Sequence, residues 1–215
     1  TCGSCELVTT ANTIQMLMEV LGLALPYSSC CPAFASEKME YAFQSGVRIV
    51  EMLKENLTPD KILTKDAFEN AVMMTLAIGG STNTCLHLPA IAKEAGVELP
   101  LDVFNRYNKQ IPTLCGIAPN GPYGIHDLFV AGGVPAVMKR LKDDLHLQCL
   151  TCNGKTIGDI IKNADIKNET VVRAKESPFL KEGGIVIVSG NLAPEGAVVK
   201  QSAVKKDMLV FTGRA

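Results

Sequence analysis

The sequence lacks any apolar run long enough to cross a membrane, which argues against a membrane-spanning protein. It also lacks a charge bias, since 21 Lys and Arg residues stand against 22 Asp and Glu residues. A chain this close to neutral offers no electrostatic basis for binding nucleic acid or an anionic membrane surface. Internal repeats, low-complexity segments and a signal-peptide pattern are absent too. With 215 residues, 47% of them hydrophobic, the chain suffices for one domain or one and a part of a second.

The cysteines are too sparse, and the helical patterns too extensive, for a small secreted disulfide scaffold. The eight cysteines are Cys2, Cys5, Cys30, Cys31, Cys85, Cys115, Cys149 and Cys152. We expect a reduced, cytoplasmic setting, in which some thiols are buried as small apolar groups and one or two bind metal. Because the chain begins at Thr1, inside what looks like a motif, we also expect it to be part of a longer protein.

The segment from Phe68 to Gly96 organises the chain. It reads as two apolar helices interrupted by Gly79 and Gly80. The first helix is apolar on most sides, which predicts that it is buried, and it should begin at Thr64 or Lys65. The second should begin near Asn83 and stop at Gly96, a C-cap glycine, with Pro89 tolerated in its first turns.

Ser81, Thr82 and Asn83 follow the two glycines and open the second helix. Small polar residues at such a position are typical of an ordinary N-cap. A helix N-terminus also presents free N–H groups and a partial positive charge, which suit a carboxylate or phosphate. Both interpretations, a cap and a substrate-binding segment, remain open at this stage.

Cys2-Gly3-Ser4-Cys5 is a Cys-x-x-Cys turn that leads into a helix beginning near Thr9 and Thr10. A thiol at a helix mouth lies where the helix dipole favours the metal-binding thiolate. Three hypotheses compete: a zinc site shared with Cys149 and Cys152, a redox dithiol, and an iron–sulfur ligand.

Further helices are expected between residues 36 and 163. Ser36 looks like the N-cap of a helix that runs to Asn56, and 101–105 and 134–141 read as helical. His126 beside Asp127 is either an acid/base pair or, more commonly, a helix-capping feature.

The character changes near residue 180, from helical patterns to β patterns. Glycine-bounded apolar residues at 183–190 predict one strand, and 196–200 and 208–211 predict two more. We therefore divide the chain into residues 1–179 and 180–215.

Five segments together resemble the dihydroxy-acid dehydratase and phosphogluconate dehydratase family. In order, they are TCGSC, TTANT, AFENAVMMTLAIGGSTNTCLHLPAIAKEAG, AGGV and GGIVIVSGNLAPEGAVVK. The segments ENLTPDKILTKDAFENA and LHLPAIAKEAGVELPLD look most like dihydroxy-acid dehydratase. Two departures from the family pattern stand out: Glu6-Leu7-Val8, in place of small residues and Met, and the pair Cys30-Cys31.

The resemblance implies an α/β fold: residues 1–179 as the helix-rich latter part of an N-terminal α/β domain, and 180–215 as the first strands of a C-terminal β-barrel-like domain. Cys5 matches a cysteine that binds the family's iron–sulfur cluster, either [2Fe–2S] or [4Fe–4S]. The other cluster cysteines, the Mg²⁺ ligands and the base match no residue of this chain.

The implied reaction is the dehydration of a 2,3-dihydroxy acid to a 2-keto acid in branched-chain amino-acid biosynthesis. The expected partners are this small-molecule substrate and further copies of the chain, as a homodimer or homotetramer. Two alternatives remain: a sugar-acid dehydratase of the same family, and a non-catalytic binding module. The 215 residues alone are expected to be inactive.

Overall fold

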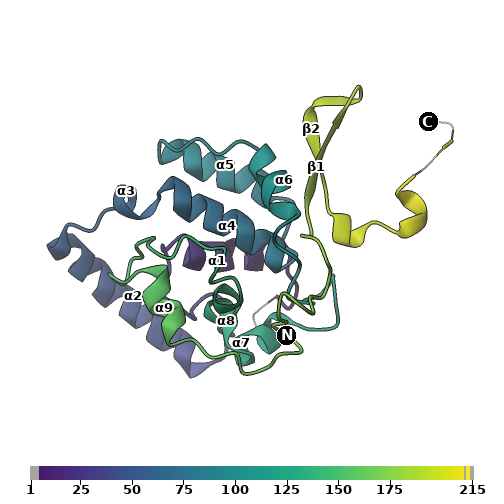
Figure 1. Cartoon of the computed structure of the whole chain (residues 1–215). Coiled ribbons are helices and arrows are strands. Elements are labelled where there is room, and N and C mark those ends of the chain that lie inside the picture. Colours follow the sequence, from purple (N-terminus) through teal and green to yellow (C-terminus); the bar gives the residue numbers. More distant parts are fainter. Residues whose placement is uncertain (1–4, 211, 214–215) are drawn as a thin grey trace.

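The structure is a computed structural model that describes residues 5–210 and 212–213. It is mostly helical, with a two-stranded antiparallel hairpin near the C-terminal end (Figure 1). The α-helices are α1 (Thr10–Val20), α2 (Ser36–Glu55), α3 (Pro59–Ile62), α4 (Lys65–Ala77), α5 (Thr84–Glu94), α6 (Asp102–Asn108), α7 (Ile125–Val130), α8 (Gly133–Arg140) and α9 (Ile157–Lys162). The strands are β1 (Val186–Gly190) and β2 (Ala193–Val199), followed by 3-10 turns at Gln201–Ala203 and Lys206–Met208.

Helix α4 runs through the middle of the helical body (Figure 1) and packs against α1, α5, α6 and α8. It begins as the sequence predicts, because the Thr64 hydroxyl accepts a hydrogen bond from the Ala67 N–H at 3.3 Å. Every residue from Ala67 to Ala77 is buried. The prediction of a first helix buried on most sides is therefore confirmed.

The connection from α4 to α5 needs glycine at both of its first positions. Gly79 has φ +59°, in the left-handed region, and a Cβ there would lie 2.6 Å from the Asn120 amide nitrogen. A Cβ on Gly80 would lie 3.0 Å from a methyl of Thr13 on α1. The chain can therefore turn this tightly against α1 only without side chains. Helix α5 ends at the predicted glycine, since Gly96 has φ +71°.

Helix α2 lies along the edge of the body (Figure 1), and none of its twenty residues, all of which the structure describes, is buried. The predicted N-cap is one residue too late: Ala35 occupies that position, and Ser36 is already helical. The far end agrees with the sequence, because Asn56 is the C-cap, with φ +53°.

The C-terminal segment forms fewer strands than expected. Strand β2 pairs antiparallel with β1, with Val186 opposite Val199, and it begins at Ala193 rather than 196. The prediction of a third strand at 208–211 is wrong for residues 208–210, which lie in a 3-10 turn and a bend. Phe211 lies outside the described residues. Apolar alternation alone makes no strand without a neighbouring backbone to pair with. The content is thus mixed α and β but mostly helical, and the division near residue 180 stays a prediction.

Asn105 of α6 attaches the hairpin to the helical body. Its side-chain amide donates to the Ile187 carbonyl at 2.7 Å, and its Oδ1 accepts from the Ile187 N–H at 2.8 Å. The side chain thus takes the place of a neighbouring strand for one residue of β1.

We expect Asn105→Ala to loosen the hairpin and leave the helical body intact. Losing both bonds should cost about 1–2 kcal/mol locally, because Ile187 is left without these partners. Native-state hydrogen exchange should then show faster exchange at 186–190 and unchanged exchange in α4. Gln110→Ala, at an exposed position beyond α6, is the matched control. Unchanged exchange in β1 would contradict the attachment.

Candidate active site at the first turn of α1

Cys5 lies in an exposed position just before α1. The Leu7 N–H donates to its Sγ at 3.4 Å, and the Thr9 hydroxyl lies 4.0 Å from the same sulfur. Thr9 is the N-cap of α1 but makes no side-chain cap bond, so no cap side chain occupies the helix mouth. This setting suits a sulfur that carries negative charge and binds a metal. Cys2, the other cysteine of the predicted turn, lies outside the described residues.

A buried asparagine fixes the loop that carries Cys5. The Asn12 amide donates to the carbonyls of Cys5 and Leu7, both at 2.8 Å. Further along, the Val8 N–H donates to the Ala118 carbonyl at 2.7 Å. The sulfur is therefore presented from a loop tied to α1 and to the 118–125 segment. The sequence reasoning missed Asn12, although an asparagine in the first turn of a helix, where its side chain can bind nearby backbone, was the available signal.

The second predicted site segment docks on the same turn of α1. The Ser81 N–H donates to the Thr13 hydroxyl at 3.2 Å, and the Ser81 hydroxyl lies 3.3 Å from that of Thr10. The Asn83 amide donates to the Thr10 hydroxyl at 2.6 Å. The structure thus brings Ser81 and Asn83 to the turn of α1 that follows Cys5.

The simple cap interpretation fails for Asn83. It holds the N-cap position of α5, but its side chain makes no cap bond and reaches α1 instead. Ser81 supplies the local turn: its hydroxyl accepts from the Asn83 N–H at 3.2 Å. Thr82 is half-buried between them. Binding of an anion by Ser81, Thr82 and Asn83 stays a prediction.

A cavity of about 300 Å³ opens beside Cys5. Its polar and sulfur-bearing lining comes from Cys5, Glu6, Asn12, Gln15, Ser29, Cys30, Cys31, Lys38 and His126. Ser81, Thr82 and Asn83 are not part of this lining, so of these three residues and Cys5 only Cys5 faces the cavity. The unusual pair Cys30-Cys31 forms part of its wall, and burial raises the pKa of both thiols.

His126 and Asp127 have different roles. The Asp127 carboxylate accepts from the Gly124 N–H at 2.8 Å and so caps α7, as the capping interpretation predicts. His126 lines the cavity, with its ring centroid 6.3 Å from that of Phe34. The two side chains therefore do not act as a pair.

A buried carboxylate holds the loop that contributes Ser29, Cys30 and Cys31 to the cavity lining. Glu19 accepts from the N–H of Tyr27 at 2.7 Å and from the N–H and hydroxyl of Ser29 at 3.2 and 2.5 Å. These bonds hold the 27–31 loop, in which Tyr27 has φ +70°. Burial raises the pKa of Glu19 to about 7, despite the hydrogen bonds that oppose the shift.

Cys149 and Cys152 serve packing elsewhere. Both are buried, and the Asn70 amide of α4 lies 3.6 Å from the Cys149 sulfur. Burial raises the pKa of the Cys149 thiol to about 11, which keeps it in the thiol form. Within residues 5–210 and 212–213, no group of three or more His, Cys, Asp or Glu side chains could hold a metal ion.

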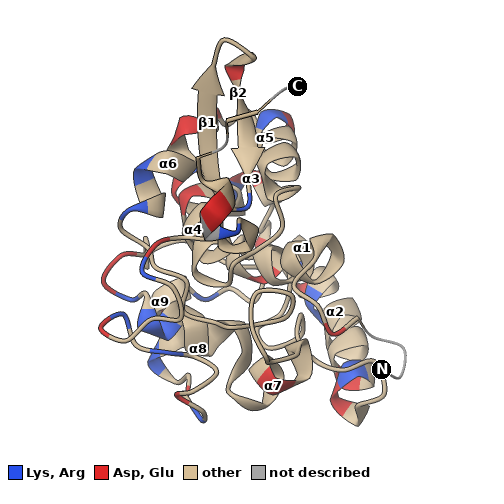
Figure 2. Ribbon diagram, turned by 90° about the vertical axis from the view of Figure 1, so that its right-hand side faces the viewer, with Lys and Arg blue, Asp and Glu red and all other residues tan. Residues whose placement is uncertain are grey.

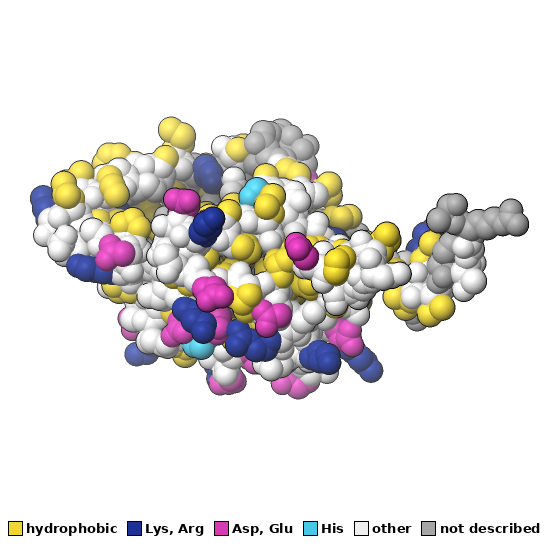
Figure 3. All heavy atoms as spheres, turned by 90° about the horizontal axis from the view of Figure 1, so that it is seen from above, with side chains coloured by type: hydrophobic (Ala, Val, Ile, Leu, Met, Phe, Trp, Pro, Cys, Tyr) yellow, Lys and Arg dark blue, Asp and Glu magenta, His cyan; other side chains and the backbone are white. Residues whose placement is uncertain are grey.

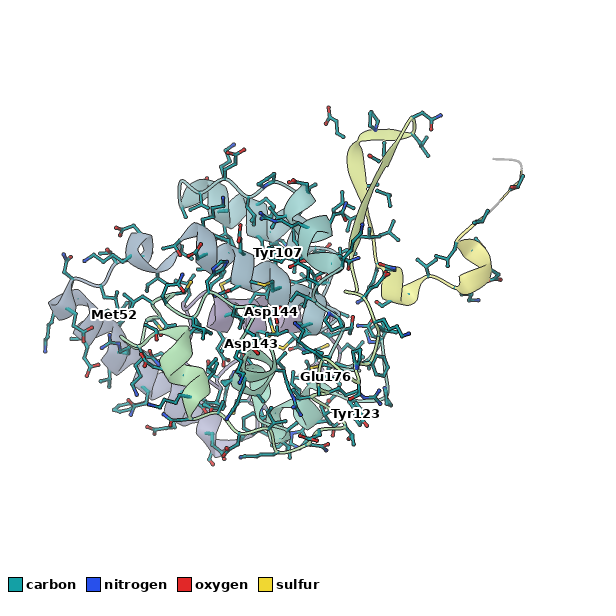
Figure 4. All side chains as sticks on the ribbon, in the orientation of Figure 1. Met52, Tyr107, Tyr123, Asp143, Asp144 and Glu176 are labelled. Atoms are coloured by element: carbon teal, nitrogen blue, oxygen red, sulfur yellow. The ribbon has the colours of Figure 1, made fainter. Side chains whose placement is uncertain are left out.

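Glu69 of α4 centres a second polar cluster. It accepts from the Tyr107 hydroxyl at 2.5 Å and pairs with Arg106 at 2.9 Å and His146 at 3.2 Å. Figure 4 shows Tyr107 where α6 meets α4. Burial would raise the pKa of Glu69, but these partners lower it. Since every group is paired, the cluster joins α4, α6 and the 141–149 segment rather than offering a reactive site.

The chain belongs to the dihydroxy-acid/6-phosphogluconate dehydratase family. Residues 1–160 match the N-terminal model of this family, and residues 170–215 match its C-terminal model. The chain is 51% identical over 217 residues to the dihydroxy-acid dehydratase of Caldanaerobacter subterraneus subsp. tengcongensis, and 49% identical over 216 residues to that of Caldicellulosiruptor bescii. It is 48% identical over 213 residues to that of Methanothermobacter thermautotrophicus.

These alignments cover 100%, 100% and 99% of this chain but only 39% of each relative. The chain thus spans about two fifths of the length of the curated relatives that it matches. Activity can be measured in a hybrid enzyme, in which this chain replaces the aligned 39% of the Caldanaerobacter protein.

Glu19 should give the 215-residue chain a distinctive pH dependence. A carboxyl whose pKa is about 7 when folded and 4.5 when unfolded binds an extra proton in the folded state between these values. Its contribution to the free energy of unfolding therefore falls, by about 2–3 kcal/mol, as the pH rises from 4.5 to 7. Urea denaturation from pH 4.5 to 8 should show this decline in the parent and its absence in Glu19→Gln. Parallel pH profiles for the two proteins would contradict the assignment.

Asn83→Leu in the hybrid enzyme tests the anion-binding prediction. The substitution removes the bond to Thr10 together with every other polar contact of this side chain. Thr10→Val is the matched control, because it removes the same bond and keeps the Asn83 amide.

If Asn83 also binds substrate, Asn83→Leu should lower kcat/KM by about 1–3 kcal/mol more than Thr10→Val does. Steady-state kinetics and melting midpoints should be measured on both variants. Equal losses of stability with equal kinetic constants would show that Asn83 only connects α1 to α5 and does not bind substrate.

Proposed function

We propose that this chain forms part of a hydro-lyase that dehydrates 2,3-dihydroxy carboxylic acids to 2-keto acids in branched-chain amino-acid biosynthesis. The observation that carries this proposal is the 51% identity, over the whole chain, to a protein named dihydroxy-acid dehydratase. Because the chain spans 39% of that relative, the activity belongs to the larger architecture, and the 215 residues alone are expected to be inactive.

The reaction removes a proton from C2 and hydroxide from C3, and the resulting enol tautomerises to the keto acid. Hydroxide leaves poorly, so the step needs a Lewis acid. An iron–sulfur cluster with one iron free of protein ligands supplies that acid when bound, and Mg²⁺ orients the substrate.

The described residues fit one part of this apparatus. Cys5 has an exposed sulfur on a fixed loop, as a cluster ligand requires, and Asn12 keeps the loop in place. We infer that Cys5 holds the cluster and that Ser81, Thr82 and Asn83 orient the substrate beside it. The base and the Mg²⁺ ligands match nothing in this chain.

Two alternative functions have less support. The family model covers 6-phosphogluconate dehydratases as well, so its match is equally consistent with a sugar-acid substrate. The relatives described above are all named dihydroxy-acid dehydratase, which favours that substrate class. A non-catalytic binding module would suit the apolar side chains that the hairpin and tail expose, such as Leu192 and Val210, but it leaves the presentation of Cys5 without a reason.

We further propose a cytoplasmic location, on the grounds of the reduced cysteines. Among the described residues, no helix is long and apolar enough to span a bilayer. Acidic and basic side chains of both signs are interspersed over the molecule (Figure 2), which fits a small-molecule substrate rather than a nucleic acid.

The proposal predicts different outcomes for two cysteine substitutions in the hybrid enzyme. Cys5→Ser should remove the iron, the visible absorbance of the cluster and nearly all of the activity, because serine is a poor cluster ligand. Cys85→Ser is the control: Cys85 is buried in α5, and burial raises its pKa to about 11. It should keep its iron and lose mainly stability.

Iron content, absorbance and keto-acid formation should be measured on both variants. Full iron content in Cys5→Ser would refute the ligand assignment. An active parent hybrid that accepts only sugar acids would refute the substrate class and leave the role of Cys5 intact.

A further inference from the structure

Glu19 of α1 is a buried carboxylate whose hydrogen-bond donors, among the described residues, are all neutral. The charged side chains in the view from above (Figure 3) lie at the surface, where water can solvate them, whereas Glu19 is only 2% exposed. Its three hydrogen bonds come from the Tyr27 N–H and from the N–H and hydroxyl of Ser29. A carboxylate buried in this way, without an ion pair, is stabilised either by a proton or by contact with water.

The 27–31 loop depends on Glu19 for its backbone contacts. In the part of the chain that the structure describes, the N–H groups of Tyr27 and Ser29 donate to the Glu19 carboxylate and to no backbone carbonyl. Tyr27 also has φ +70°, in the left-handed region, which costs free energy for a residue with a large side chain. The closed loop is therefore strained, and opening it would relieve the strain.

Other contacts of the loop do not involve Glu19. The Ser28 hydroxyl donates to the Leu25 carbonyl at 2.6 Å, and the Lys38 ammonium donates to the Ser28 carbonyl at 3.0 Å. Cys30 is buried as part of the hydrophobic core. Because these contacts oppose opening, the open loop should be a minor state of the folded protein.

The groups that face Glu19 leave it as the one that titrates near neutrality. Besides Lys38, the titratable side chains that interact with its charge are Tyr27, Cys30, Tyr41 and Cys152. Burial raises the pKa of these tyrosines and cysteines, so they stay neutral. The Lys38 charge favours the ionised form of Glu19, but burial outweighs it and raises the pKa of Glu19 to about 7.

We propose that Glu19 is a pH-sensitive switch of the 27–31 loop: its protonated form keeps the loop closed, and its ionised form favours an open loop in which water solvates the carboxylate. A group that binds its proton more tightly in the closed state favours opening as the pH rises. Opening removes Ser29, Cys30 and Cys31 from the lining of the cavity beside Cys5.

The proposal goes beyond the proposed function, because it depends on neither cluster nor substrate. It also requires no free surface, since the loop that covers Glu19 belongs to this chain.

Native-state hydrogen exchange of the 215-residue chain, from about pH 5.5 to about pH 8, tests the proposal. After correction for intrinsic exchange rates, opening at the Tyr27 and Ser29 amides should become about ten- to thirtyfold more frequent over this range, as expected for a carboxyl whose pKa is about 7 when buried and 4.5 when solvated. These amides should exchange faster than those of α4 and depend little on urea, because only the loop opens.

Two substitutions should change this pH dependence in opposite directions. Glu19→Gln should abolish it, because glutamine does not titrate. Ser29→Ala should strengthen it, because it removes a hydroxyl that stabilises the ionised form in the closed loop. Opening at high pH should then increase at least about threefold further. Ser29→Ala retains Glu19, so it keeps the test decisive even where Glu19→Gln does not fold.

Two further variants control the experiment. Glu176→Gln removes a carboxylate at an exposed position (Figure 4). His126→Gln removes the histidine of the cavity lining, because histidine also changes charge near neutrality. Both variants should keep the pH dependence of the parent.

Four outcomes would overturn the proposal. The first is opening at Tyr27 and Ser29 that does not change with pH. The second is a pH dependence that persists in Glu19→Gln, because another group would then be titrating. The third is exchange of these amides with the same rate and urea dependence as those of α4, which would show that Glu19 acts only on global unfolding. The fourth is a loop in the hybrid enzyme that stays equally closed at every pH.

Discussion

The close crossing of the α4–α5 connection over α1 is the constraint on which the rest of the site depends. Gly80 fits between Thr13 of α1 and Thr75 of α4, with contacts that a Cβ would tighten to 3.0 and 3.1 Å. Because the Gly80 backbone packs directly against these threonines, Ser81 and Asn83 lie close enough to α1 to form direct hydrogen bonds with it. Cys5 precedes the same turn. One packing contact in the core thus sets the relation between two segments some seventy-five residues apart in sequence.

The site is held mainly by backbone groups and neutral side chains. The Asn12 amide donates to two carbonyls of the Cys5 loop. The hydroxyls of Thr13 and Thr10 accept hydrogen bonds from Ser81 and Asn83. Such bonds keep their geometry across pH, whereas the 27–31 loop depends on Glu19, whose pKa burial raises to about 7. The Cys5 loop and the 27–31 loop both contribute to the cavity lining, and we expect only the second to respond to the protonation of Glu19.

Local chemistry determined what the sequence could predict. Helix α4, the turn at Gly79 and Gly80 and the stop at Gly96 follow from an apolar pattern with Thr64 and glycines at its ends. The prediction of a third strand failed, because a strand depends on a neighbouring strand that a local pattern does not reveal. Glu19 and Asn12 escaped notice because their roles are set by loops that pack on α1 from elsewhere. Cys5 and Asn83 were found through motif resemblance, whereas their connection through α1 needed the fold.

Helix α2 links the surface of the molecule to this site. Phe34, just before the helix, and Lys38, in its first turn, line the cavity beside Cys5, and Arg48 connects the helix to the Cys152 carbonyl. A helix gains most of its stability by packing an amphipathic face, and polar contacts at a surface contribute little. In this chain α2 has polar contacts and a few half-buried side chains, such as Tyr41 and Met52, but no buried residue, so it is held weakly. The position of Lys38, and with it part of the cavity wall, therefore depends on how α2 is held against the body.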